Sequence, residues 1–407
     1  MANFYWSEEQ RNNLSTRVRD GFDEGLTNSG ICQFYKTVSA GRRIARTNAY
    51  RILSDRRQTG RAAAGLGGPE MKIGKILGYI LLALVIVAAI AIPATVGIHP
   101  FIGPRKRAAT DRAYERTPQR LERGRYLVDN VSGCLFCHSP HDWTKHDAPI
   151  PTGMAGAGAV FPEADLPGAV TAPNLTPDPE TGLGRWSDDE IGRAIREGVD
   201  RDGNALFPLM PYERYRNFSD EDLASIVVFL RSLAPVRNPL PPTKIIFPVR
   251  YLIRNAPAPI TSAVPKPDTS TPANRGKYLV EVAGCADCHT PQKRGQPLPG
   301  MSFAGGFIFE GPWGRVASAN ITPDAATGFP YDTEAMFASA LRAGYARGRA
   351  LNQIMPWEAY RGLTDEDLLA IFSYLRTMPA VHHRVDNTKD PTECRLCNAK
   401  HGAGAEN

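Results

Sequence analysis

The sequence predicts a mainly helical protein in which one membrane-spanning helix precedes two tandem helical domains. Three observations support this: an apolar run without charge, an internal repeat, and helix-start signals ahead of apolar stripes in both copies of the repeat. Strand-like alternation is sparse. With 407 residues the chain can build several hydrophobic cores without needing disulfides.

The predicted membrane span is the run Ile76 to Ile98, which carries no charged residue and is long enough to cross a bilayer. The segment before it, Met71-Lys72-Ile73-Gly74-Lys75, is typical of the start of a signal anchor. Residues 71–98 are therefore predicted to form a retained transmembrane anchor. Either translation then starts at Met71, which would make residues 1–70 an artefact of start-site choice, or these residues form a cytoplasmic extension.

The part of the chain after the anchor is duplicated. RGRYLVDNVSGCLFC at 123–137 returns as RGKYLVEVAGCADC at 275–288, and NLTPDPETG from Asn174 returns as NITPDAATG from Asn320. Each copy is predicted to hold helices before its cysteines, near 187–198 and 332–344, and behind the start signals Ser219 and Thr364. The chain thus divides into an extension (1–70), the anchor (71–98), domain 1 (109–235), a Pro-rich linker (236–274), domain 2 (275–385) and a tail (386–407).

The net charge of +6 lies mostly in the first 70 residues, which hold 11 Lys/Arg against 7 Asp/Glu. The remainder is close to neutral. This distribution gives no electrostatic footprint for nucleic acid.

Six of the seven cysteines form three C-x-x-C pairs, and two of these pairs continue into histidine. Cys134, Cys137 and His138, and likewise Cys285, Cys288 and His289, make the C-x-x-C-H haem attachment motif. Two thiols at this spacing can form thioethers to the porphyrin, while the next imidazole binds the iron. A thioredoxin-like pair or half a zinc site is the alternative for one such motif, but its recurrence in a repeat favours haem.

The predicted sixth iron ligands are Met210 and Met355, each followed by proline in matching contexts before the last helix of its copy. Other methionines are poorer candidates: Met154 and Met301 follow the motifs too closely, and Met336 and Met378 have no counterpart in the other copy. His141 and His146 are expected to play a surface or supporting role. With both irons fully ligated, no position is open for a substrate.

The third pair, Cys394 and Cys397, is followed by Asn398 in place of histidine. We expect a disulfide or free dithiol there rather than a third haem. His401 would complete three metal ligands, with a fourth lacking.

Residues 120–385 resemble the cytochrome c subunits of bacterial membrane-bound alcohol and gluconate dehydrogenases. The resemblance lies in CLFCH and CADCH, in NLTPDPETGLG and NITPDAATGF, and in LMPYERYRNFSDEDL and IMPWEAYRGLTDEDL. It implies two tandem class I cytochrome c domains with two covalent haem c groups, held by Cys134, Cys137, His138 and Met210 and by Cys285, Cys288, His289 and Met355. It further implies that Asn174 and Asn320 lie beside the haem edges, with Trp186 near the first.

The predicted function is electron transfer from a membrane-bound dehydrogenase toward a respiratory acceptor, without catalysis by this chain. Because covalent haem attachment takes place outside the cytoplasm, the domains should face the periplasm of a bacterial cytoplasmic membrane. A free-standing tethered shuttle remains an alternative, as does a haem enzyme of the peroxidase kind or a gas sensor.

Overall fold

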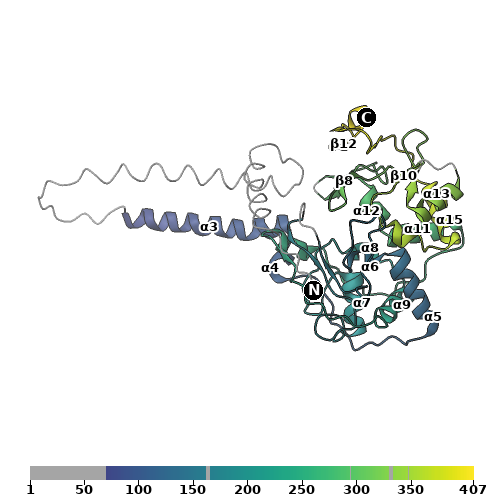
Figure 1. Ribbon diagram of the computed structural model, residues 1–407. Coiled ribbons are helices and arrows are strands. Elements are labelled where there is room, and N and C mark those ends of the chain that lie inside the picture. Colours follow the sequence, from purple (N-terminus) through teal and green to yellow (C-terminus); the bar gives the residue numbers. More distant parts are fainter. Residues whose placement is uncertain (1–69, 162–165, 294, 330–332, 347) are drawn as a thin grey trace, which may run out of the picture.

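The structure, a computed structural model, describes residues 70–161, 166–293, 295–329, 333–346 and 348–407 (Figure 1). Nearly all of the predicted extension, residues 1–70, lies outside these ranges. Helix α3 (Glu70–Val96) projects away from the rest of the molecule, and its segment Gly74–Val96 is long and apolar enough to cross a membrane. This segment is not buried against any other described part of the chain.

The helix ends two residues before the predicted limit at Ile98. Gly97 adopts a positive φ of 82°, and Asn255 Nδ2 donates a hydrogen bond of 2.7 Å to the free carbonyl of Val96. A C-terminal carbonyl needs such a partner once the helix stops. The short helix α4 (His99–Ile102) follows directly.

The first helical unit consists of α5, its π-helical continuation η1, and helices α6 to α9. Their bounds are α5 Pro118–Tyr126, η1 Leu127–Val131, α6 Cys134–Cys137, α7 Asp188–Glu197, α8 Tyr212–Tyr215 and α9 Asp220–Leu230. Ser187 and Glu190 form a capping box at α7, and Ser219 caps α9 by accepting from Asp222 N. The helices predicted in this copy are therefore confirmed.

The second helical unit repeats this order with α11 to α15. Their bounds are α11 Pro272–Val282, α12 Cys285–His289, α13 Glu334–Ala343, α14 Trp357–Tyr360 and α15 Asp365–Leu375. Thr364 caps α15, as the sequence predicted. Helix α13 begins after Thr333, whose hydroxyl accepts from Met336 N, so the predicted start at Asp332 came slightly early.

Within the described residues the strands pair only as short antiparallel two-stranded ladders. These are β1 (Ala159–Val160) with β3 (Thr171–Ala172), β2 (Gly168–Ala169) with β4 (Lys244–Ile245), β5 (Gln292–Lys293) with β6 (Gln296–Pro297), β7 (Ile308–Gly311) with β8 (Gly314–Ala317), β9 (Tyr345–Ala346) with β10 (Arg349–Ala350), and β11 (Pro391–Glu393) with β12 (Lys400–Gly402). The expected scarcity of strand structure is confirmed. The fold is mainly helical.

The Pro-rich segment between the units packs against the first unit and the chain that precedes it. Strand β4 pairs with β2, and the short helices α10 (Val249–Leu252) and η2 (Ile253–Asn255) contact α4. Arg254 donates to the carbonyl of Pro100 and Arg105 donates to that of Asn255. The segment therefore fixes the chain that emerges from α3.

In each unit the first long helix crosses the last one at a glycine. Gly124 of α5 faces Ser225 of α9, and Gly276 of α11 faces Ala370 of α15. A Cβ at either glycine would lie 1.9 Å from the facing carbonyl oxygen. Only a residue without a side chain allows two backbones to approach so closely, which explains why the glycine of RG-x-Y-L-V recurs in both copies.

The two units contact each other through reciprocal hydrogen bonds. Tyr126 of the first unit donates to the carboxylate of Asp367 in the second, while Tyr278 of the second donates to Asp222 of the first at 2.5 Å. Each carboxylate also binds an arginine of its own unit, at 2.7 Å from Arg123 and 2.5 Å from Arg275. The duplicated halves thus meet through equivalent residues, as in a two-fold interface.

Replacing Gly276 by alanine should destabilise the protein, because the new Cβ must push apart two packed backbones. The cost should be about 2–3 kcal/mol, a fall of about 5–10 °C in the melting temperature of the detergent-solubilised chain followed by circular dichroism. Gly78→Ala is the matched control, since nothing lies within 4 Å of its Cβ position. Equal melting temperatures for the two variants would contradict this account of the crossing.

Candidate cofactor-binding site

Each C-x-x-C-H motif occupies a tight helical turn that begins at a glycine in the left-handed region. Gly133 has a φ of 57° before α6, and Gly284 has a φ of 70° before α12. Glycine adopts this conformation without a steric penalty. The chain can therefore leave η1 or α11 and turn both cysteines and the following histidine toward one side.

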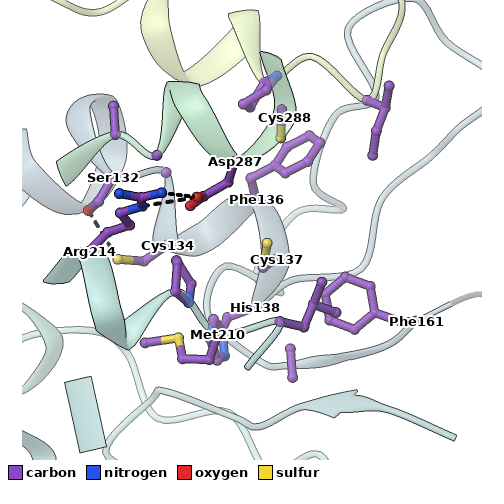
Figure 2. Close-up of a pocket in the computed structure, with 18 of the residues that line it drawn as sticks. Ser132, Cys134, Phe136, Cys137, His138, Phe161, Met210, Arg214, Asp287 and Cys288 are labelled. Carbon is purple, nitrogen blue, oxygen red and sulfur yellow. Dashed lines mark hydrogen bonds and ion pairs between the residues drawn. The ribbon is translucent and has the colours of Figure 1, made fainter. Parts of the chain in front are cut away.

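All eight predicted haem-binding residues line one connected cavity of about 2630 Å³: Cys134, Cys137, His138, Met210, Cys285, Cys288, His289 and Met355. Figure 2 shows the first motif with Met210, and Cys288 of the second unit above them. Apolar side chains such as Ile191, Phe337 and Ile371 make up much of the remaining wall. A cavity of this size and character can take large, flat, apolar ligands.

Both motif histidines are held in the same way. His138 Nδ1 lies 2.7 Å from the carbonyl oxygen of Pro173, and His289 Nδ1 lies 2.8 Å from that of Ala319. A carbonyl can only accept, so Nδ1 carries the proton and Nε2 keeps a free lone pair. Burial lowers the pKa of both histidines, which also favours the neutral ligating form.

Met210 and Met355 sit in equivalent backbone turns. The backbone carbonyl of Met210 accepts from Tyr212 N at 2.8 Å, and that of Met355 accepts from Trp357 N at 2.7 Å. The intervening prolines, Pro211 and Pro356, have almost the same conformation. The less favoured methionines, Met154, Met301, Met336 and Met378, do not line the cavity.

The motif cysteines do not have the character of a thioredoxin-like redox pair. Partial burial raises the pKa of Cys134 to about 11 and that of Cys285 to about 12, while Cys137 and Cys288 are exposed at the edge of the cavity. A redox dithiol depends on a lowered pKa, because the thiolate is the nucleophile. The thiols border the cavity instead, where a cofactor can bond to them.

Asn174 and Asn320 line the cavity, yet their amides are used by the protein itself. Asn174 Nδ2 donates to the carbonyl of Val236 at 2.7 Å, and Asn320 Nδ2 donates to that of Val381 at 2.8 Å. Their Oδ1 atoms accept from the backbone N–H and hydroxyl of Thr176 or Thr322. Each asparagine therefore ties the loop that carries the histidine's carbonyl partner to the segment after the last helix.

The sequence analysis missed three further features of the cavity. Tyr215 and Tyr360 donate at 3.2 Å to the carbonyls of Ser132 and Ala283, just before each motif. Arg214 forms an ion pair of 2.8 Å with Asp287 between the two motifs (Figure 2). The repeated Tyr-Arg in YERYR and WEAYR was a signal for the tyrosines, whereas nothing in the sequence indicated the ion pair.

The histidines near the first motif have separate roles. His141 bonds through Nε2 to the carbonyl of Phe136 at 2.8 Å, in keeping with the expected supporting role. His146 stacks on Trp357 of the second unit with ring centroids 5.0 Å apart and also lines the cavity. Trp186, which the resemblance places near the first haem edge, lines the same cavity.

The expectation that Cys394, Cys397 and His401 lack a fourth metal ligand was wrong, because His383 joins them. The two cysteines are buried free thiols, which agrees with the free-dithiol alternative. His383 lies in the segment after α15, so its position in sequence gave no sign that it would reach the tail. None of these four residues lines the large cavity.

The donor set of the cavity fits haem c. Two thiols, an imidazole with a free Nε2 and a thioether are available in each unit, and the surrounding wall is largely apolar. The helical fold and these motifs are typical of a c-type cytochrome, the class of protein in which haem is bound covalently.

Comparison with known proteins supports this class. Residues 273–379 match the cytochrome c family model. The chain is 36% identical over 204 residues to one of the subunits of the nicotinate dehydrogenase of Pseudomonas putida, a match covering 47% of this chain and 16% of that protein. It is 28% identical over 295 residues to the cytochrome c subunit of the quinone alcohol dehydrogenase of Gluconacetobacter polyoxogenes, covering 68% and 60%.

A third relative is the diheme cytochrome c-type of Cereibacter sphaeroides, 29% identical over 264 residues, with 62% of this chain and 83% of that protein covered. Residues 273–379 therefore match the cytochrome c family, and the resemblance of the chain to the cytochrome c subunits of alcohol and gluconate dehydrogenases is confirmed. It spans 60% or less of the length of the alcohol and nicotinate dehydrogenase subunits.

Proposed function

We propose that this chain is a membrane-anchored dihaem cytochrome c that passes electrons from a dehydrogenase toward a respiratory acceptor. The observation that carries the proposal is that, in each unit, a motif histidine with a free Nε2 and a Met-Pro methionine line the same cavity. Bound haem supplies one-electron redox chemistry there. The chain itself supplies the ligands and the surroundings.

The proposed ligands follow the repeat. Cys134 and Cys137 would hold one haem through thioethers, with His138 and Met210 on its iron. Cys285, Cys288, His289 and Met355 would do the same for the second. On this view residues 109–235 and 275–385 are two class I cytochrome c domains, supported by the matched order of α5 to α9 and α11 to α15.

Filled coordination favours electron transfer over a haem enzyme or a gas sensor, both of which need an open iron position. A thioether ligand raises the reduction potential relative to a second imidazole. The carbonyls of Pro173 and Ala319 hold the imidazoles in one tautomer and orientation. Rigid ligands and a largely apolar wall keep structural change between the two redox states small, which suits repeated one-electron exchange.

The two sites are contiguous, which supports electron exchange within one molecule. Both motifs line the same cavity, and the Arg214–Asp287 ion pair lies between them. The Tyr126–Asp367 and Tyr278–Asp222 bonds hold the units in one relative position. A fixed arrangement of this kind would keep the distance between the two redox centres constant.

The exposed residues of α4 and of the neighbouring linker are evidence for attachment to the bilayer. Phe101 and Ile102 of α4 are 58% and 68% exposed, and Phe247 of the neighbouring linker is 67% exposed. Tyr251 lies between Arg250 and Arg254, whose guanidinium carbons are 4.6 and 4.7 Å from its ring centroid. Exposed apolar groups beside aromatic and basic residues are typical of a membrane interface. With haem attachment outside the cytoplasm, the domains would face the periplasm.

The relatives guide the choice of partner. Several are named as cytochrome subunits of alcohol, gluconate or fructose dehydrogenases. A dehydrogenase of this broad class is therefore the proposed electron donor.

The first prediction concerns the number of haems. Intact mass spectrometry of the purified chain should show two covalent haem adducts, because two pairs of cysteines border the cavity. Replacing Cys134 and Cys137 together by alanine should leave one adduct. As a control, the Cys394→Ser/Cys397→Ser variant should keep both, and a third adduct on the unaltered chain would refute this assignment.

The second prediction concerns the axial methionines. Met210→Ala and Met355→Ala should each remove about half of the far-red absorption band of methionine-ligated ferric haem, lower one of the two potentials and allow carbon monoxide to bind. Met154→Ala, which alters a methionine outside the cavity, should leave the spectrum unchanged. Retention of the full band in both cavity variants would show that another residue ligates iron.

The third prediction tests the function. The chain should stay in membranes washed with alkaline carbonate, and detergent purification from its native host should bring a dehydrogenase with it. Adding that enzyme's substrate should reduce both haems within its turnover time. Recovery of the chain alone, with haems reduced only by soluble donors, would identify a tethered shuttle and overturn the dehydrogenase partnership.

A further inference from the structure

The C-terminal tail builds a cluster of four metal-ligating side chains away from the haem cavity. His383, Cys394, Cys397 and His401 place their ligand atoms within 4.8 Å of one another. The histidines are 0% exposed, and the cysteines are 1% and 4% exposed. Four buried side chains with only nitrogen and sulfur donors rarely gather without a reason, because each is a polar group removed from water.

The backbone around the cysteines forms a compact hairpin. Strand β11 ends at Glu393, strand β12 begins at Lys400, and the two cysteines lie in the turn between them. Cys394 N donates to the carbonyl of Ala399, and Asn398 N donates to that of Cys394, both at 2.9 Å. The turn thus points both thiols toward the same interior point.

Both imidazoles bond to a backbone carbonyl through Nδ1, which leaves Nε2 available to the cluster. His383 Nδ1 donates to the carbonyl of Ala304 at 2.8 Å, and His401 Nδ1 donates to that of Gly402 at 3.0 Å. His383 Nε2 then lies 3.4 Å from Cys394 Sγ. His401 Nε2 is buried and has no hydrogen-bond partner. A buried acceptor without a partner is costly, and a metal ion would satisfy it.

We propose that these four residues bind one structural zinc ion. Zinc prefers four tetrahedral ligands, and two thiolates with two imidazoles are a common set. At ordinary zinc bond lengths such ligands lie about 3.3–3.8 Å apart, so the observed cluster needs only a small contraction. All four positions are protein side chains, which leaves none for a substrate and makes the site structural.

Other uses of the two cysteines explain less. A disulfide would engage the sulfurs but leave His401 Nε2 buried and unpaired. A third haem would need a histidine where Asn398 stands. A four-cysteine iron–sulfur cluster lacks two thiols among the described residues near the site.

The proposed ion would fix the tail against the second unit near its haem-binding loop. Asn320 Nδ2 donates to the carbonyl of His383 at 3.2 Å, and Arg315 donates to that of Lys400 at 2.7 Å. A Cβ on Gly306 would lie 2.7 Å from His383 Cε1, so the loop approaches the ring closely. Ala319, whose carbonyl holds His289, directly precedes Asn320. Zinc binding would therefore stabilise the loop beside one haem as well as the tail.

The full-length chain, purified in detergent without metal-affinity chromatography, tests the proposal. Elemental analysis should find one zinc per chain beside the haem iron. X-ray absorption at the zinc edge should show two sulfur ligands at about 2.3 Å and two nitrogen ligands at about 2.0 Å. Absence of zinc, a ligand shell without sulfur, or a mass two hydrogens lower with Cys394 and Cys397 bonded to each other would each overturn it.

Variants separate the site from the haems. The Cys394→Ser/Cys397→Ser variant should hold less than about a tenth of the zinc of the unaltered chain while keeping its covalent haems. His382→Ala is the matched control, because His382 neighbours a proposed ligand but is 59% exposed and lies outside the cluster. Equal zinc content in the two variants would overturn the assignment. If the double variant does not accumulate, the X-ray absorption of the unaltered chain still decides.

Discussion

The close crossing of two helices in each unit is the constraint on which the rest of the structure depends. Gly124 and Gly276 let α5 rest on α9 and α11 rest on α15 with their backbones in contact. The cysteine turn follows the first helix of each pair, and the Met-Pro turn precedes the last. Closing the pair therefore brings residues about 70 positions apart to the same cavity, where a cofactor can complete the core.

The same helices provide the contact between the two units. Asp222 and Asp367 lie in the first turns of α9 and α15, where a negative charge is stabilised by the helix N-terminus. Each binds an arginine of its own unit and a tyrosine of the other. Burial and the neighbouring carboxylate raise the pKa of Tyr126 to about 12, so its hydroxyl remains a donor throughout the neutral range. Charge-assisted hydrogen bonds of this kind stabilise by about 1.5–3 kcal/mol.

A recurring arrangement in this protein is an imidazole whose Nδ1 bonds to a backbone carbonyl while Nε2 makes no bond to the backbone. His138 and His289 show it in the cavity, and His383 and His401 show it in the tail. The carbonyl selects the tautomer and fixes the ring plane, so Nε2 points in one direction. In the second unit Asn320 contacts both arrangements, since it follows Ala319 and donates to the carbonyl of His383. The proposed haem site and the tail cluster thus share one supporting loop.

The sequence by itself determined the features that depend on residues close together in the sequence. The C-x-x-C-H spacing, the caps at Ser187, Ser219 and Thr364, the apolar span and the duplication could all be predicted, because each acts over a few residues or repeats as a block. Only the tertiary structure decided which distant groups meet. Tyr126 reaches Asp367, 241 residues away, and His138 finds its acceptor at Pro173, 35 residues away. His383 likewise joined the tail cysteines without any sequence signal, because a ligand set is defined by distance in space and a folded chain can bring together residues from any two positions.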